Sequence, residues 1–328
     1  MKKFISLSLV LLMMFSVLSL AGCGKAEPLK MGIGITAEIS EIKNADGETN
    51  GSADSVATFA AVLLDKDGKI VKCAIDTANN ALAFTSEGKP VAAGELLTKG
   101  EKGDNYGMKA YGGAKKEWYE QKDAFISVII GKTIDEVKAL EKDGKGTDEV
   151  VNAGCTIKVS EFIPALEEAV KNAVESEATA DDTLQVGIVT SQSDKKDATD
   201  EAKGLNEFSL TFVATAIDAD KKIVASKTDA LSFAVEFDTK GVSETEFGKD
   251  VATKRDAGDD YGMKKAGAKK EWYAQADAFD AQIIGKTADG ITTLADNTGK
   301  AGDDLVTAGC TINVADMVKA AVKAATVK

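Results

Sequence analysis

Two short segments of the chain combine residues that are suited to chemistry. Each reads Ala-Gly-Cys-Thr, at 153–156 and again at 308–311. The glycine lets a ligand approach the backbone closely. We expect a helix to follow each segment, and the free N–H groups at a helix N-terminus favour a phosphate. Each segment is therefore a candidate cofactor-binding site. Its residues are Gly154, Cys155 and Thr156 in the first copy and Gly309, Cys310 and Thr311 in the second.

A purely structural interpretation of the same segments stays open. Gly154 would be a turn residue, Cys155 a small buried hydrophobic side chain, and Thr156 the start of a strand or a cap. As free thiols, Cys155 and Cys310 would be candidates for redox chemistry, although no adjacent cationic residue indicates a lowered pKa.

The amino-acid composition excludes several kinds of chemistry. The chain has no histidine, which removes the commonest transition-metal ligand and every Ser-His or Cys-His nucleophile. Apart from Cys23, its cysteines are Cys73, Cys155 and Cys310, an odd number without a CxxC pair, so we expect no disulfide framework. The acidic loops near 104 and 259 offer too few ligands to favour calcium. We therefore predict no metal site and no catalytic residues of the chain's own.

The first 22 residues have the pattern of an export signal. Lys2 and Lys3 precede an apolar run over 4–20, and small residues follow. An uncleaved transmembrane helix is the alternative for a run of this length. The segment Leu-Ala-Gly-Cys at 20–23 is similar to a bacterial lipobox, in which the cysteine carries a diacylglycerol and an acyl chain such as palmitate. We expect residues 1–22 to be removed and Cys23 to anchor the protein at the extracytoplasmic face of the cell membrane.

The remaining composition is that of an acidic globular protein. The formal charge is −13, with 44% hydrophobic residues and 3 prolines. Such a surface repels nucleic acid, so we expect no nucleic-acid partner.

The chain is a tandem repeat with an offset of 154 to 155 residues between matching segments. Matching stretches include Tyr-Gly-Met-Lys at 106–109 and 261–264, Ala-Lys-Lys-Glu-Trp-Tyr at 114–119 and 268–273, and Asp-Ala-Phe at 123–125 and 277–279. This is domain duplication. We predict a lipidated tether at 23–30, a first domain at 31–174, an acidic extended linker at 175–183 and a second domain at 184–328.

Within each copy the pattern predicts strands first and helices later. Strand-like segments occupy 31–40, 56–64 and 70–76. Turn residues at 65–69 lie between the last two, which indicates a hairpin. Trp118, Lys122, Phe125 and Ile129 follow at helical spacing, and Gly131 would end that helix. Thr133 and Glu136 have capping-box spacing. The expected fold is α+β, with an antiparallel sheet and packed helices in each copy.

Residues shared by the copies are candidates for structure as well as function. We expect Trp118 to belong to the core and Tyr119, one residue off the helical stripe, to point toward a cleft edge. The Lys115-Lys116 pair is interpreted as a solvent-exposed flank rather than a site for phosphate or an acidic partner. The 106–109 segment, with its glycine and methionine, suggests a loop suited to a planar ligand.

Three of these features resemble the FMN-binding domain family. They are the Asp-x-Asp-Gly-Lys-Ile turn at 65–70, the Phe-x5-Gly-Lys-Thr segment at 125–133, and a Gly-x-Thr followed by an amphipathic helix. The family includes subunits of sodium-pumping quinone reductases and flavinylated envelope lipoproteins of Gram-positive bacteria. In flavinylated members a transferase joins FMN through its phosphate to the threonine of a Ser-Gly-Ala-Thr-like motif.

The resemblance covers most of each copy and implies FMN at Thr156 and Thr311, with Gly154 and Gly309 as the motif glycines. This chain departs from the motif. Alanine replaces the serine, cysteine replaces the alanine, and the nearest upstream acids lie farther away than in the family. Covalent FMN, noncovalent FMN and no flavin therefore remain alternatives.

The resemblance predicts an electron carrier rather than a stand-alone enzyme. A membrane quinone reductase and a flavin transferase would be its partners, and the flavin would supply the redox chemistry. The alternative is a non-redox surface lipoprotein that binds an extracellular ligand or acts as a surface antigen. A solute-binding protein of an importer is disfavoured, because its lobes enclose one shared site whereas each copy here carries its own set of motifs.

Overall fold

The computed structural model describes residues 27–248 and 250–326. The predicted signal peptide and the predicted lipidation at Cys23 lie outside these residues. Among the described residues, no helix has the length and apolar character needed to cross a membrane.

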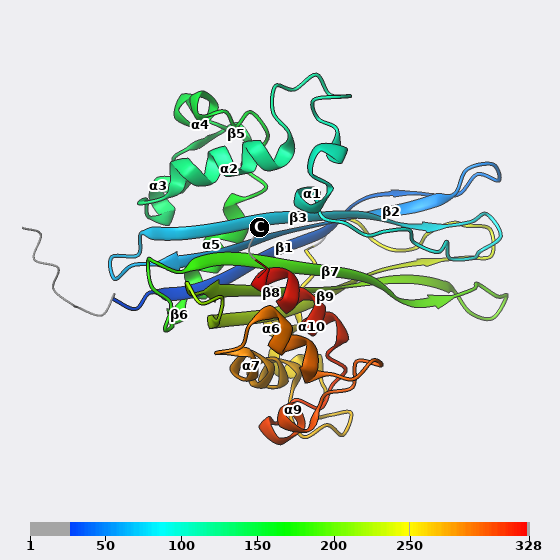
Figure 1. The fold of residues 1–328 in the computed structure, drawn as a ribbon. Helices are drawn as coiled ribbons and strands as arrows, with labels where there is room; N and C mark the ends of the chain where they lie inside the picture. Colours follow the sequence, from blue (N-terminus) through cyan, green and yellow to red (C-terminus); the bar gives the residue numbers. More distant parts are fainter. Residues whose placement is uncertain (1–26, 249, 327–328) are drawn as a thin grey trace, which may run out of the picture.

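The first half begins with three long antiparallel strands (Figure 1). They are β1 (Lys30–Lys43), β2 (Gly51–Leu64) and β3 (Ile70–Phe84). The predicted hairpin between β2 and β3 is confirmed. Its turn is held by the Asp65 carboxylate, which accepts hydrogen bonds from the N–H groups of Asp67 and Lys69 at 2.9 Å each. The strands extend well beyond the predicted segments, because alternate residues of β3 up to Phe84 are buried.

The second half repeats this arrangement with β7 (Thr183–Lys196), β8 (Gly204–Ile217) and β9 (Ile223–Phe237). Its β8–β9 turn lacks the glycine of the first half. Gly68 has a φ of 75°, and the equivalent Lys221 adopts 63°. The Asp218 carboxylate accepts the same pair of backbone hydrogen bonds as Asp65, which supports this strained conformation.

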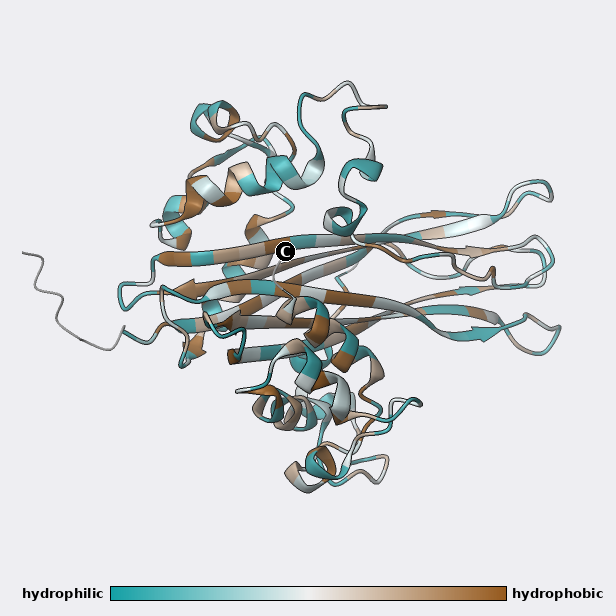
Figure 2. Ribbon diagram, in the orientation of Figure 1, coloured by the Kyte–Doolittle hydropathy of each residue, from teal (hydrophilic) through white to brown (hydrophobic). Residues whose placement is uncertain are grey.

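The two sheets pack face to face, and Figure 2 shows the apolar residues along their strands. Equivalent residues of the two halves meet in one shared core. The ring centroids of Phe59 and Phe212 are 3.8 Å apart, and those of Phe84 and Phe237 are 4.7 Å apart. Such self-matched contacts define an approximate two-fold axis between the halves. This axis places β3 beside β7 at one edge of the sandwich and β1 beside β9 at the other.

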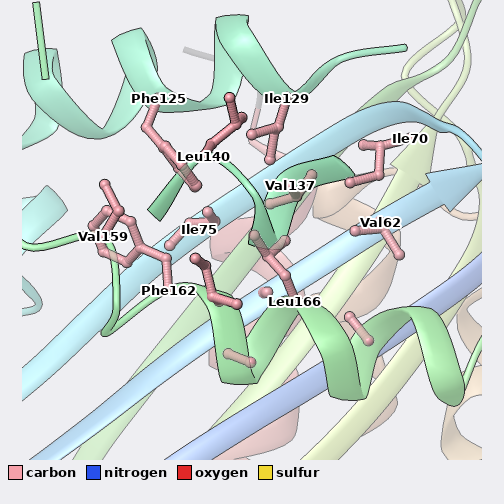
Figure 3. Packing of buried hydrophobic residues seen from close by; sticks show 14 of the residues in the cluster. Val62, Ile70, Ile75, Phe125, Ile129, Val137, Leu140, Val159, Phe162 and Leu166 are labelled. Carbon is pink, nitrogen blue, oxygen red and sulfur yellow. The ribbon is translucent and has the colours of Figure 1, made fainter. Parts of the chain in front are cut away.

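Helices cover the outer face of each sheet, which gives four layers. In the first half these are α2 (Trp118–Ile129) and α5 (Ile163–Lys171), and in the second α7 (Trp272–Ile283) and α10 (Ala315–Ala325). Figure 3 shows Phe125, Phe162 and Leu166 packed over the strand residues Val62 and Ile75. The α+β fold is thus shown, and Trp118 belongs to the core as predicted.

Glycine permits the close contact between the terminal helix and the sheet in each half. A Cβ on Gly34 would lie 2.0 Å from the Ala165 carbonyl oxygen, and one on Gly187 would lie 1.9 Å from that of Ala320. Only glycine fits at these two positions of β1 and β7.

Short elements complete the described chain. In the first half these are α1 (Lys99–Lys102), η1 (Gly103–Tyr106), α3 (Ile134–Lys138), β4 (Glu141–Lys142), β5 (Lys145–Gly146), α4 (Asp148–Ala153) and β6 (Val174–Glu175). In the second half they are α6 (Lys254–Ala257), η2 (Gly258–Tyr261), α8 (Ala288–Ile291), η3 (Thr292–Leu294) and α9 (Asp303–Ala308). The predicted capping box of Thr133 and Glu136 is present at the start of α3.

The segment 175–183, predicted to be an extended linker, packs against the protein. Glu175 pairs with Lys30 of β1. The Ala178 side chain is fully buried, and the Ala178 carbonyl accepts a hydrogen bond from the Leu29 N–H at 2.7 Å. Small residues allow this close packing, so the two halves are joined rigidly rather than by a free tether.

The shared core predicts cooperative unfolding of both halves. Truncating Phe212→Ala leaves a cavity against Phe59, so we expect a loss of about 3–5 kcal/mol in the free energy of unfolding. Urea denaturation, monitored by tryptophan fluorescence and circular dichroism, measures this loss. Tyr111→Ala is the control, because Tyr111 is 92% exposed. Two separate transitions in the unmodified protein would contradict a shared core.

Candidate functional site

The Ala-Gly-Cys-Thr segments lie at the C-terminal ends of short helices. Gly154 ends α4 with a φ of 108°, and Gly309 ends α9 with a φ of 97°. A helix follows each segment, as predicted: α5 begins at Ile163 and α10 at Ala315. The segments themselves lie at the C-terminal ends of α4 and α9, where the partial charge is negative and does not favour a phosphate.

The thiols and hydroxyls of these segments have structural partners. Cys155 and Cys310 are fully buried, and burial raises the pKa of each thiol to about 11. Thr156 is exposed, but its N–H and hydroxyl both donate to the Gln121 Oε1, at 2.8 and 2.9 Å. Thr311 makes the same two bonds to Gln275. The structure thus agrees with the structural interpretation of the cysteines.

The other repeated motifs join the same hydrogen-bonded network. The buried Glu117 carboxylate accepts the N–H groups of Met108 and Lys109 at 2.8 and 3.0 Å. Gln121 Nε2 donates to the Lys116 carbonyl at 3.0 Å. The Lys116 ammonium in turn donates to the Ala153 carbonyl at the end of α4, at 3.3 Å. Only Lys115 of the lysine pair is the exposed flank that we predicted.

This network explains why these residues recur in both copies. Glu271, Gln275 and Lys270 make the matching bonds in the second half. Sequence reasoning missed the glutamines, although their signal was present: Gln121 and Gln275 occupy the same place in the two copies, four residues after the repeated glutamate. The network secures the loop at 106–109 to α2 and α4.

A groove with a volume of about 850 Å³ lies elsewhere, at the edge where β3 meets β7. Its walls come from β3, α1 and α2 of the first half and from β7 and α10 of the second. Thr326, directly after α10, lies at this edge. Apolar side chains line much of it, including Cys73, Ile75, Ile126, Val186, Ile188 and Val322. Polar groups include Asp76, Thr98, Tyr119, Lys122, Asp123 and Lys323.

The groove differs from what the sequence predicted. Tyr119 does lie at a cleft edge, as expected. None of the predicted cofactor-binding residues lines the groove. Each half does carry its own set of motifs, as predicted, but this groove has walls from both halves.

Asp76 holds α1 against β3 on one side of the groove. Its carboxylate accepts hydrogen bonds from the N–H groups of Thr77 and Gly100, at 2.8 and 2.9 Å, and from the Thr98 hydroxyl at 2.6 Å. Burial raises the pKa of Asp76 despite these donors. The equivalent Asp229 has the same role, and burial raises its pKa to about 6.

Two lysines of the groove have different surroundings. Lys323 contacts the Glu101 carboxylate and donates to the Ile188 carbonyl at the edge of β7, at 2.8 Å. Lys122 contacts Asp123 at 2.8 Å, where the side-chain exposures are 19% and 61%. The Lys122 charge opposes a rise in the pKa of Cys73, but burial dominates and raises that pKa to about 12.

The equivalent edge, where β1 meets β9, is filled by side chains. The Arg255 guanidinium contacts Asp277 at 2.9 Å and Asp280 at 3.3 Å. The Asp280 carboxylate also accepts hydrogen bonds from the Ser226 hydroxyl, at 2.8 Å, and from the Thr228 hydroxyl and N–H, at 2.6 and 3.0 Å. We call Ser226, Thr228, Arg255 and Asp280 the polar plug. Two smaller cavities of about 250 and 230 Å³ remain beside it.

Several exchanges between equivalent positions separate the open edge from the filled one. Those that concern the polar plug and its surroundings are Cys73 for Ser226, Ile75 for Thr228, Gly100 for Arg255, Lys122 for Ala276 and Ile126 for Asp280. A search for residues that are identical in the two copies cannot find this groove, because the groove depends on residues that differ between them. The signal in the sequence was the change of chemical class at these equivalent positions.

Comparison with known proteins gives one partial similarity. No family model and no solved structure matches the chain. A stretch of 126 residues is 33% identical to a chlorophenol reductase of Desulfitobacterium hafniense. This match covers 34% of the present chain and 38% of the relative, so less than half of either protein is compared.

Within residues 27–248 and 250–326, no group of three or more Cys, Asp or Glu side chains is placed to hold a metal ion.

The polar plug predicts unequal roles for the two carboxylates that contact Arg255. Asp280→Ala removes the buried carboxylate and leaves several donors unpaired, so we expect a loss of about 3 kcal/mol in the free energy of unfolding. Asp277→Ala removes a carboxylate that is 53% exposed, and we expect a loss below about 1 kcal/mol. Urea denaturation compares the two variants. Equal losses would contradict the structural role assigned to Asp280.

Proposed function

We propose that the chain is an extracytoplasmic lipoprotein, held at the membrane through Cys23, that binds one small amphipathic molecule in the groove between β3 and β7. The observation that carries this proposal is the contrast between the two edges. One is filled by the polar plug, whereas the other retains a volume of about 850 Å³. Small-molecule sites commonly have volumes of about 300–1,000 Å³.

The exchanges at the open edge act together. Gly100 leaves free the space that the Arg255 side chain fills in the other half, and Ile126 removes the carboxylate that would pair with such a cation. Cys73 and Ile75 replace the hydroxyl donors of Ser226 and Thr228. A single loss would leave a buried polar group unpaired, which is costly. Their joint replacement gives an open surface that is largely apolar.

The lining also indicates the kind of molecule. An apolar surface from both halves would contact the body of the ligand, and Lys122 and Tyr119 would contact a polar group at the rim. A small aromatic compound with a polar substituent fits this description. The similarity to a chlorophenol reductase supports this class, since a chlorophenol is such a compound.

The polar plug offers a direct test of this function. Gly100→Arg, Ile126→Asp, Cys73→Ser and Ile75→Thr together transfer it to the open edge. A Cβ on Gly100 would lie 2.8 Å from the Asp76 carboxylate, but the Arg255 N–H still bonds to the equivalent Asp229 at 3.2 Å, so a small shift accommodates the change. We expect the unmodified protein to bind one equivalent of the neutral probe N-phenyl-1-naphthylamine, and the transferred plug to abolish binding. Fluorescence titration measures both.

The second edge provides the matched control. Arg255→Gly, Asp280→Ile, Ser226→Cys and Thr228→Ile together remove the plug there, and we expect a second equivalent of probe to bind. Retained binding in the variant with the transferred plug, at an unchanged melting temperature, would show that the probe binds elsewhere and would overturn the proposal.

A flavin-dependent electron carrier is the second candidate. It is supported by the exposed Thr156 within the motif that resembles the FMN-binding family, and by the similarity to a reductase. In this role the Thr156 hydroxyl would carry the FMN phosphate. Attachment of FMN would therefore break the hydrogen bond from that hydroxyl to Gln121.

The flavin candidate predicts a coloured protein after coexpression with a flavin transferase. Flavin absorbance should persist after denaturation and disappear in a Thr156→Val, Thr311→Val variant. The Thr156→Ser, Thr311→Ser variant is the control, because it keeps both hydroxyls. Visible spectra and intact masses check these results. A colourless protein of unmodified mass would exclude covalent FMN.

A further inference from the structure

We infer that the molecule bound in the groove carries a carboxylate, which contacts the Ile75 N–H and the Lys122 ammonium beside Ile126. This inference rests on the proposed function. It goes further by naming the ligand's polar group and the residue that selects it, Lys122.

The second half contains a complete carboxylate-binding site that the protein fills itself. The Asp280 carboxylate comes from α7 and meets the edge of β9, where it accepts the Thr228 N–H at 3.0 Å. Two hydroxyls and the Arg255 guanidinium complete its surroundings. A carboxylate that is hydrogen-bonded and paired with a cation is the arrangement in which a buried charge is stable.

The first half has the same backbone donor at the same place. Ile75 pairs with Ala60 in the register in which Thr228 pairs with Val213. The Thr228 N–H points away from the neighbouring strand toward Asp280, so the matching register directs the Ile75 N–H toward the groove. Because Ile126 stands where Asp280 stands in the other half, this chain supplies no carboxylate from that position.

The cation is also present, but on a different element. Lys122 lies on α2, one helical turn before Ile126, whereas its equivalent is Ala276. Its ammonium has three donors, and it contacts the exposed Asp123 at 2.8 Å. In the second half Arg255 is bound by two carboxylates and a carbonyl. Lys122 therefore has donors left for an acid on the ligand.

The carboxylates of the groove already have partners, and the Asp123 carboxylate contacts Lys122 itself. Glu101 is paired with Lys323, and the Asp76 carboxylate accepts three hydrogen bonds from α1, Thr98 and its own strand. Around the Ile75 N–H the lining is apolar, because Cys73 and Ile126 stand where the polar plug has Ser226 and Asp280. The ligand class is thus a monocarboxylic acid with an apolar, ring-sized body.

A pair of probes that differ only in charge tests this inference. Naphthalene-2-carboxylate and naphthalene-2-carboxamide have the same ring, and isothermal titration at pH 7 compares their dissociation constants. We expect the unmodified protein to bind the carboxylate at least about tenfold more tightly, because bonds to a charged acceptor are stronger. Lys122→Met should remove this preference while the carboxamide still binds. Lys115→Met, which removes an exposed lysine next to the same helix, should keep it.

Each alternative outcome overturns a different statement. Equal binding of both probes by the unmodified protein, abolished by the transferred plug, would keep the groove as the ligand site and overturn the carboxylate. A preference that survives Lys122→Met would overturn the role of Lys122. Binding of neither probe, or binding that the transferred plug leaves intact, would overturn both the inference and the proposed function.

Discussion

The packing of two sheets against each other is the constraint on which this structure depends. Equivalent phenylalanines meet at the interface, as Phe59 does with Phe212. Because the contact is made by the same face of each half, neither sheet can bury its apolar face without the other. The same geometry creates two equivalent edges, β3 with β7 and β1 with β9. A binding site at either edge is therefore lined by residues of both halves.

The two similar halves differ at those edges while they share the core. The Phe pairs, the Glu117–Gln121 network and the Asp76–α1 contact recur in both halves. Other residues at the edges differ between the halves. At one edge the side chains of Arg255 and Asp280 satisfy each other, and at the other a groove remains open.

Much of the fold could be predicted from local patterns. The turn at 65–69, the helical stripe of Trp118 and Phe125, and the capping box at Thr133 depend on residues close in sequence, and all are present. The site could not be predicted in this way. Its two edge strands, β3 and β7, are far apart in the chain, and their proximity follows from sheet packing. Gly154 and Thr156 were predicted to bind a cofactor because they are identical in the two copies. In the structure Gly154 ends α4, and Thr156 is hydrogen-bonded to Gln121.

The terminal helix of each half also protects an edge strand. Glu168 of α5 accepts the Ile35 N–H at 2.9 Å, and Lys323 of α10 donates to the Ile188 carbonyl at 2.8 Å. Unpaired backbone groups on a long edge strand are a template for adding a strand from another copy. These two side chains, of opposite charge, each occupy one backbone group to which an added strand would otherwise bond.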